Sequence, residues 1–356
     1  MRFGTSSGIT PERNGWRKGL LASATLLGAV HALPVRAEAL DEPPQHVFGE
    51  NLAGWSLASL SKSDQPPAPE PPEAAPLAPE PTYSLTPSGH VPAEFAAKRG
   101  FFQQAGTIRT ELIVVTGYFA VQSVPKFFKE TSGFSFHDEG WFGTGTGNAG
   151  VDKLTHAYNS YLLAEILHAR LHKNTGASAG DAVTAAILSA GFMALNEVSD
   201  AFEPDSGYSM QDITANIVGA SFSVVRNTVP GLKEKLAFKV EIVPNDDIYT
   251  RAGKKHYEQQ RYMLSLKGAG FRQLEHSPFR FLDLQVGYYA SDFRNSDRAQ
   301  GIVPKRHLFV GVGLNLGEIL FANSHSTIGK AAHSVLDYVQ IPYTSLRYDT
   351  TGRFGS

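Results

Sequence analysis

Residues 151–173 read VDKLTHAYNSYLLAEILHARLHK and place apolar side chains three and four positions apart. This spacing is typical of one face of an α-helix. Three further segments, residues 107–128, 181–198 and 209–229, also have helical character. The last begins with a match to the helix-capping box at Ser209 and ends at Pro230 and Gly231. We therefore predict a bundle of about four helices over residues 100–232.

Small residues recur every four positions in two of these helices, at Ala186, Ala190 and Ala194 and at Ala215, Gly219 and Ser223. Such rows let helix backbones approach closely, both in membranes and in tight soluble bundles. The apolar runs are about 13–17 residues long, shorter than the roughly 20 that a spanning helix needs. The sequence is therefore compatible with a soluble or interfacial bundle and also with embedded helices.

Apolar and polar residues alternate in four later segments, at about 236–242, 262–267, 282–288 and 308–316. This period is typical of half-buried antiparallel strands. Strands that are apolar outside and polar inside also occur in outer-membrane barrels, but a closed barrel usually needs about eight. We favour a sheet packed on the helices, with a helix at about 317–339 covering it. The expected class is α+β: a helical bundle followed by a small antiparallel β-sheet domain with a C-terminal helix, over residues 233–356.

The first 99 residues differ in composition from the rest. Arg13, Arg17 and Lys18 precede an uncharged apolar run at 19–33 and small residues at 37 and 39, which together are typical of a cleaved signal peptide. Ten prolines between residues 66 and 92 favour an extended spacer. We predict a signal peptide at 1–39 and a disordered proline-rich tether at 40–99. The expected location is the periplasm or outer membrane of a Gram-negative bacterium.

Charge and cysteine content exclude several classes of protein and site. The 32 basic and 34 acidic residues give a net charge of −2, with no basic excess for nucleic-acid binding. The sequence contains no cysteine, which excludes disulfides, thiolate metal sites, cysteine nucleophiles and a lipid anchor on an N-terminal cysteine.

Ionisable and amide side chains interrupt the predicted helices near three of their ends, and an up-and-down bundle brings such ends together. We therefore predict one polar cluster made of Asp152, Lys153, His156, Glu197, Asp200, Asp212 and Asn216.

Four interpretations of these residues remain open, one of which is that they are scattered and unrelated surface residues. In a structural network, Asp152 and Asp212 cap helix N-termini, and Glu197 pairs with Lys153 or Arg109. In a metal site, Asp152, His156, Glu197 and Asp212 hold a divalent ion that activates water. Without a metal, His156 acts as a base oriented by Asp152.

The same residues carry a resemblance. The segments GVDKLTHAY at 150–158, NEVSDAF at 196–202 and GYSMQD at 207–212, followed by ANIVGA at 215–220, resemble the YfiM-like family of uncharacterised bacterial envelope proteins. More distantly, their acidic and histidine positions are similar to those of VanZ-like membrane proteins. The resemblance covers about residues 106–232 and implies a place in the cell envelope. It carries no catalytic assignment, and the lipid anchor of some members lacks its cysteine here.

These observations favour an exported envelope protein that serves as a membrane-proximal structural or interaction module. We expect partners among envelope membrane or cell-wall components, and none among nucleic acids. The alternative is an envelope hydrolase or transferase that uses the Asp/His/Glu cluster on a lipid or cell-wall intermediate. That alternative requires the cluster to converge in space.

Overall fold

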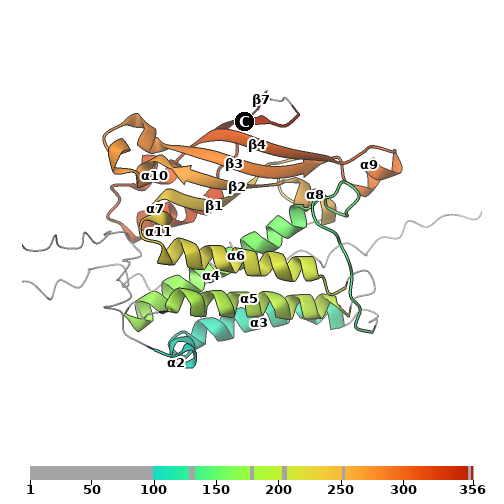
Figure 1. The fold of residues 1–356 in the computed structure, drawn as a ribbon, viewed down its shortest axis with the longest axis horizontal. Coiled ribbons are helices and arrows are strands. Elements are labelled where there is room, and N and C mark those ends of the chain that lie inside the picture. Colours follow the sequence, from blue (N-terminus) through green and yellow to red (C-terminus); the bar gives the residue numbers. More distant parts are fainter. Residues whose placement is uncertain are drawn as a thin grey trace, which may run out of the picture.

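The computed structural model describes residues 99–127, 133–176, 180–202, 207–250, 253–351 and 354–355. The predicted signal peptide and, apart from Arg99, the predicted tether lie outside the described residues. Long helices fill the first part of the described chain and strands the second, with further short helices among the strands. The predicted α+β class is therefore confirmed. Figure 1 shows the helices stacked on one side of the sheet.

Four helices before the first strand agree with the predicted segments to within a few residues: α3 (Arg109–Phe127), α4 (Val151–Thr175), α5 (Asp181–Asp200) and α6 (Met210–Thr228). The short helices α2 (Phe101–Gly106) and α7 (Leu232–Lys235) were not predicted. Ser209 is the N-cap of α6, and its hydroxyl accepts a hydrogen bond from the Asp212 N–H. Gly150 holds the N-cap position of α4. The interpretation of Asp152 and Asp212 as caps is therefore wrong, because both lie inside the first helical turn.

The buried helix α4 forms the centre of the helical layer. Contacts of His156 with Glu197 and of His168 with Asp181 show that α5 runs antiparallel to it. Helix α6 runs parallel to α4, and Gly219 allows the two backbones to touch. A Cβ atom at Gly219 would lie 1.8 Å from the carbonyl oxygen of Ala157. The predicted row of small residues on α6 therefore lies at a close helix–helix contact.

In the described part of the chain, seven strands form one sheet in the order β5-β1-β2-β3-β4-β6-β7. The pairing is antiparallel except between β1 and β5. The four predicted strands are β1 (Leu236–Ile242), β2 (Gln260–Lys267), β3 (Leu282–Ser291) and β4 (Lys305–Leu314). Sequence analysis missed β5 (Val339–Gln340), β6 (Ser345–Asp349) and β7 (Phe354–Gly355).

Short helices connect and cover the strands. They are α8 (Gly253–Glu258), α9 (Asn295–Ala299), α10 (Leu316–Phe321) and α11 (Thr327–Leu336). The helix predicted at 317–339 is thus divided in two, because Ser326 starts a new helix by accepting a hydrogen bond from the Gly329 N–H.

The helices and the sheet share a core. Tyr158 and Tyr161 of α4 lie against Phe238 of β1, with ring centroids 5.5 and 5.7 Å apart, and Tyr158 also contacts Tyr262 of β2. The Tyr262 hydroxyl donates a hydrogen bond to Thr155 at 2.9 Å. These contacts fix the face that α4 presents to the sheet, and with it the position of the polar residues on its other faces.

Candidate functional site

The N-terminus of α4 places Lys153 between three carboxylates. Its Nζ lies 2.5 Å from Glu139, 3.0 Å from Asp152 and 2.8 Å from Asp212, while its side chain is only 2% exposed. One buried ammonium therefore joins α4, α6 and the segment before α4. Buried charges persist only with pairing of this kind.

His156 lies one turn further along α4 and connects α5 with α6. Its Nδ1 is 3.3 Å from Glu197 Oε1 and its Nε2 is 3.6 Å from Asp212 Oδ1. The imidazole is 18% exposed, whereas the Glu197 side chain is 2% exposed. Solvent therefore reaches the histidine, whereas its Glu197 partner is buried.

The two remaining predicted residues lie beside this centre. Asp200, near the end of α5, accepts a hydrogen bond from Asn196 at 3.2 Å. Asn216 lies one turn after Asp212 on α6 and is 1% exposed. Within the described residues, neither amide atom of Asn216 has a hydrogen-bond partner, and the same holds for Glu197 Oε1. Buried polar atoms without partners are rare and often mark a position for water, an ion or a ligand.

Burial and charge shift the proton affinities of the cluster in opposite directions. Burial, together with the carboxylates of Asp212 and Asp200, raises the pKa of Glu197 to about 9. Burial and Asp212 also raise the pKa of Glu139 to about 7. For Asp212 burial acts in the same direction, but His156 and Lys153 outweigh it and lower the pKa. At neutral pH the cluster therefore contains an ionised Asp212 beside a protonated Glu197.

Sequence analysis missed Glu139. Glu139 lies in the loop 134–147 before α4, where no periodicity marks an acidic residue as buried. The structure holds this loop through two arginines of the strand-rich part: Arg298 donates to the Thr146 carbonyl oxygen at 2.6 Å, and Arg306 to that of Phe142 at 2.9 Å. These contacts between segments far apart in the sequence thus place Glu139 next to Lys153.

The four predicted metal ligands do not form one set, and together with Glu139 they fall into two overlapping sets. His156, Glu197 and Asp212 form one, and Glu139, Asp152 and Asp212 form the other, each with donor atoms within 4.8 Å of one another. In the second set the Lys153 ammonium already lies among the carboxylates, so an ion would have to displace it. The first set, an imidazole and two carboxyl groups, is the better match for a divalent cation.

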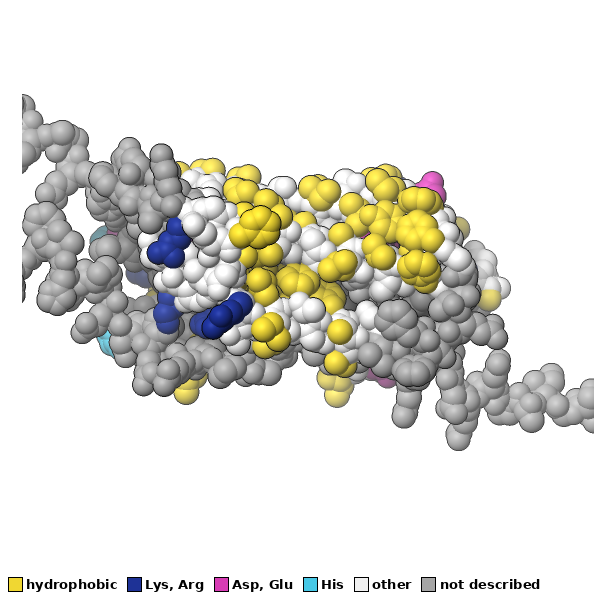
Figure 2. All heavy atoms as spheres, turned by 90° about the horizontal axis from the view of Figure 1, so that it is seen from below, with side chains coloured by type: hydrophobic (Ala, Val, Ile, Leu, Met, Phe, Trp, Pro, Cys, Tyr) yellow, Lys and Arg dark blue, Asp and Glu magenta, His cyan; other side chains and the backbone are white. Residues whose placement is uncertain are grey.

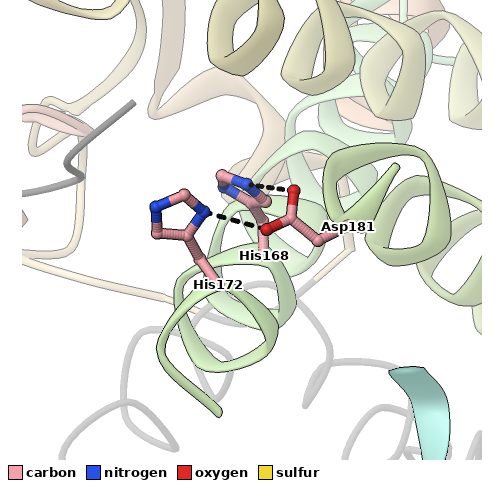
Figure 3. Close-up of side chains that lie close together, drawn as sticks. All are labelled: His168, His172 and Asp181. Carbon is pink, nitrogen blue, oxygen red and sulfur yellow. Dashed lines mark hydrogen bonds and ion pairs between the residues drawn. The ribbon is translucent and has the colours of Figure 1, made fainter. Parts of the chain in front are cut away.

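A second cluster lies at the opposite end of α4, and sequence analysis missed it as well. His168 and His172 are four residues apart on α4, and Asp181 is the first residue of α5. Figure 3 shows both imidazole rings directed at the Asp181 carboxylate. The available signal was the H-x-x-x-H spacing, which places both histidines on one helical face.

Comparison with known proteins finds a matching family model. Residues 138–228 match the model of a family described as predicted periplasmic lipoproteins of unknown function (DUF2279). No curated protein and no solved structure matches the chain. The matched segment includes Glu139 and all seven predicted residues of the cluster. The comparison therefore supports an exported protein of the bacterial envelope that is similar, over residues 138–228, to a family of unknown function.

Proposed function

We propose that the chain is a membrane-proximal structural module that is seated on a lipid bilayer of the envelope. The observation that carries this proposal is the outer face of α3, α5 and α6, which is apolar and exposed. The YfiM-like resemblance, and the more distant one to VanZ-like membrane proteins, point to the same location.

The exposed side chains of α5 form an uncharged stripe. Val183, Ile187 and Leu195 are 45, 54 and 65% exposed. No charged residue occurs at 112–123 in α3, 182–196 in α5 or 213–225 in α6. In Figure 2 apolar side chains extend across this face, while lysines and arginines gather toward one end of it. Apolar surfaces of this extent mark sites of protein or membrane interaction.

The length of the uncharged face favours lipid contact without a span. At about 1.5 Å rise per residue these runs extend about 18–22 Å, less than the roughly 30 Å of a bilayer core. Among the described helices, α5 alone is long and apolar enough to cross a membrane, and 39% of its most apolar window is buried within the protein. A position at the membrane–water interface agrees with the short uncharged runs and with the partial burial of α5 within the protein.

The sheet has the polarity that suits an apolar environment. On β3 and β4 the apolar side chains of Leu284, Val286, Val310 and Val312 are 43–55% exposed. The opposite face buries its charges as pairs, including Lys239 with Asp283 at 2.7 Å. Burying paired charges while exposing leucine and valine reverses the usual arrangement of soluble proteins.

Flotation tests this proposal. The exported chain is mixed with phosphatidylethanolamine and phosphatidylglycerol vesicles and centrifuged through a density gradient. We expect the wild type to float and the double variant Ile187→Glu, Leu195→Glu to remain in the dense fraction. The matched control, Gln273→Glu with Gln300→Glu, adds the same charge at exposed polar positions and should float. Val286→Glu with Val310→Glu tests the sheet separately. A wild type that stays in the dense fraction and is monodisperse without detergent would refute the proposal.

A second candidate function, hydrolysis or group transfer on a lipid or cell-wall intermediate, rests on the buried amide of Asn216, which has no hydrogen-bond partner among the described residues. His156, a partly exposed member of the cluster, is positioned to hold a proton between Glu197 and a bound molecule. The test is incubation with bacterial lipid extract and detection of new species by mass spectrometry. If this function operates, His156→Gln abolishes turnover in a folded protein. The control His333→Gln, which alters a histidine beside Glu318, leaves turnover unchanged.

A further inference from the structure

The cluster at the end of α4 has the geometry of a binding site for one ion. His168 Nε2 lies 3.2 Å from Asp181 Oδ1, and His172 Nδ1 lies 2.9 Å from Asp181 Oδ2. The three side chains offer one donor atom each within 4.8 Å of one another. Each imidazole faces its own oxygen of the carboxylate (Figure 3).

The charge of this cluster differs from that of the cluster at the other end of α4. Asp212 is in contact with the Lys153 ammonium, whereas the ion pairs of Asp181 within the described residues are with the two histidines. A cation entering here meets a carboxylate that, among the described residues, pairs with no lysine or arginine that it would have to displace.

The donor set and its exposure suit a transition metal. Two imidazole nitrogens and a carboxylate oxygen are the ligands of many zinc sites that keep a fourth position for water. At ligand distances of about 2.1 Å, donors around a tetrahedral ion lie about 3.4 Å apart, so small side-chain rotations close the present set. His168 is 5% and His172 21% exposed at the side chain, so the site is enclosed on one side and reachable on the other.

We propose that His168, His172 and Asp181 bind one divalent transition-metal ion of the zinc class, with water in the fourth position. The ion fastens the end of α4 to the start of α5. This site is separate from the cluster around Lys153 and does not depend on the proposed function.

The test uses the full exported chain in detergent, stripped with a chelator and titrated with zinc chloride. We expect one ion per chain by calorimetry and a higher melting temperature with zinc. Affinity should fall at least tenfold in His172→Gln and in Asp181→Asn. The matched control, His156→Gln, alters the histidine of the other candidate set and should leave the affinity unchanged. No binding in the wild type, or loss of binding in His156→Gln alone, would overturn the proposal.

X-ray absorption of the zinc-loaded wild type tests the ligand set without relying on the folding of a variant. The proposed site contributes two imidazoles, whereas the set of His156, Glu197 and Asp212 contains one. Two imidazoles per zinc support the assignment, and one contradicts it. Without an ion the same three residues tie the helices by hydrogen bonds alone, and zinc would then leave the melting temperature unchanged.

Discussion

The substitution Lys153→Met tests whether Lys153 and its carboxylate partners form a buried structural network or a group of surface charges. Methionine fills a similar volume but removes the ammonium that lies 2.5–3.0 Å from the carboxylates of Glu139, Asp152 and Asp212. The Lys153 and Asp212 side chains are 2% and 4% exposed, so water cannot replace the lost partner.

The expected loss is about 3–5 kcal/mol of the free energy of unfolding, which is typical when one partner of a buried ion pair is removed. Burial and mutual repulsion then raise the pKa values of the remaining carboxyl groups in the folded variant. The folded variant binds more protons than its unfolded chain, so its stability rises as the pH falls, by about 1.4 kcal/mol per pH unit and group. The deficit relative to wild type should therefore shrink between pH 8 and pH 5.

Urea unfolding in mild detergent, followed by far-ultraviolet circular dichroism, measures both effects. Lys153→Met combined with Asp212→Asn should recover about 1–3 kcal/mol, because one uncompensated charge is removed. Lys330→Met, which alters a partly exposed lysine of α11, should change stability by no more than about 0.5 kcal/mol. A loss below about 1 kcal/mol, or a deficit that grows on acidification, would refute the buried network.

Two further predictions test the cluster and the helix contact. Because the pKa of Glu197 is raised to about 9, the folded protein keeps this proton between pH 5 and pH 9 while the unfolded chain releases it. Stability then falls with rising pH across this window. In Glu197→Gln the melting temperature should depend less on pH than in the wild type, and at pH 8 it should be higher than in the wild type. An unchanged dependence of the melting temperature on pH would contradict the raised pKa of Glu197. Gly219→Ala should cost about 1–3 kcal/mol in urea unfolding, because its Cβ would meet the Ala157 backbone at 1.8 Å. Gly191→Ala, with open space around the new Cβ, should be neutral or up to about 1 kcal/mol stabilising, and equal effects at both sites would contradict the close contact.

The helices were predictable because their apolar residues repeat at helical spacing and their ends carry local signals such as Ser209. Local signals also sufficed to place Asp152, Glu197 and Asp212 at helix ends that an up-and-down bundle brings together. Glu139 was not predictable, since its position depends on Arg298 and Arg306, which come about 160 residues later in the chain. The His168 and His172 spacing was present in the sequence, but its meaning depended on Asp181 lying opposite.

The strands show a different limit. A period of two separates a strand into two faces but does not tell which face is buried. Which face of the strands is buried depends on how the sheet curls. Neighbouring strands lie about 4.8 Å apart, so β1 and β6, four positions apart, would be about 19 Å from each other in a flat sheet. Yet Arg347 of β6 lies 2.5 Å from Glu241 of β1, and both side chains are at most 4% exposed. The sheet therefore curls around its polar face, where these charges find partners, and turns leucine and valine outward. Charge pairs between strands that are distant in the sheet therefore decide which face is buried and which is exposed. No local sequence pattern encodes these pairs.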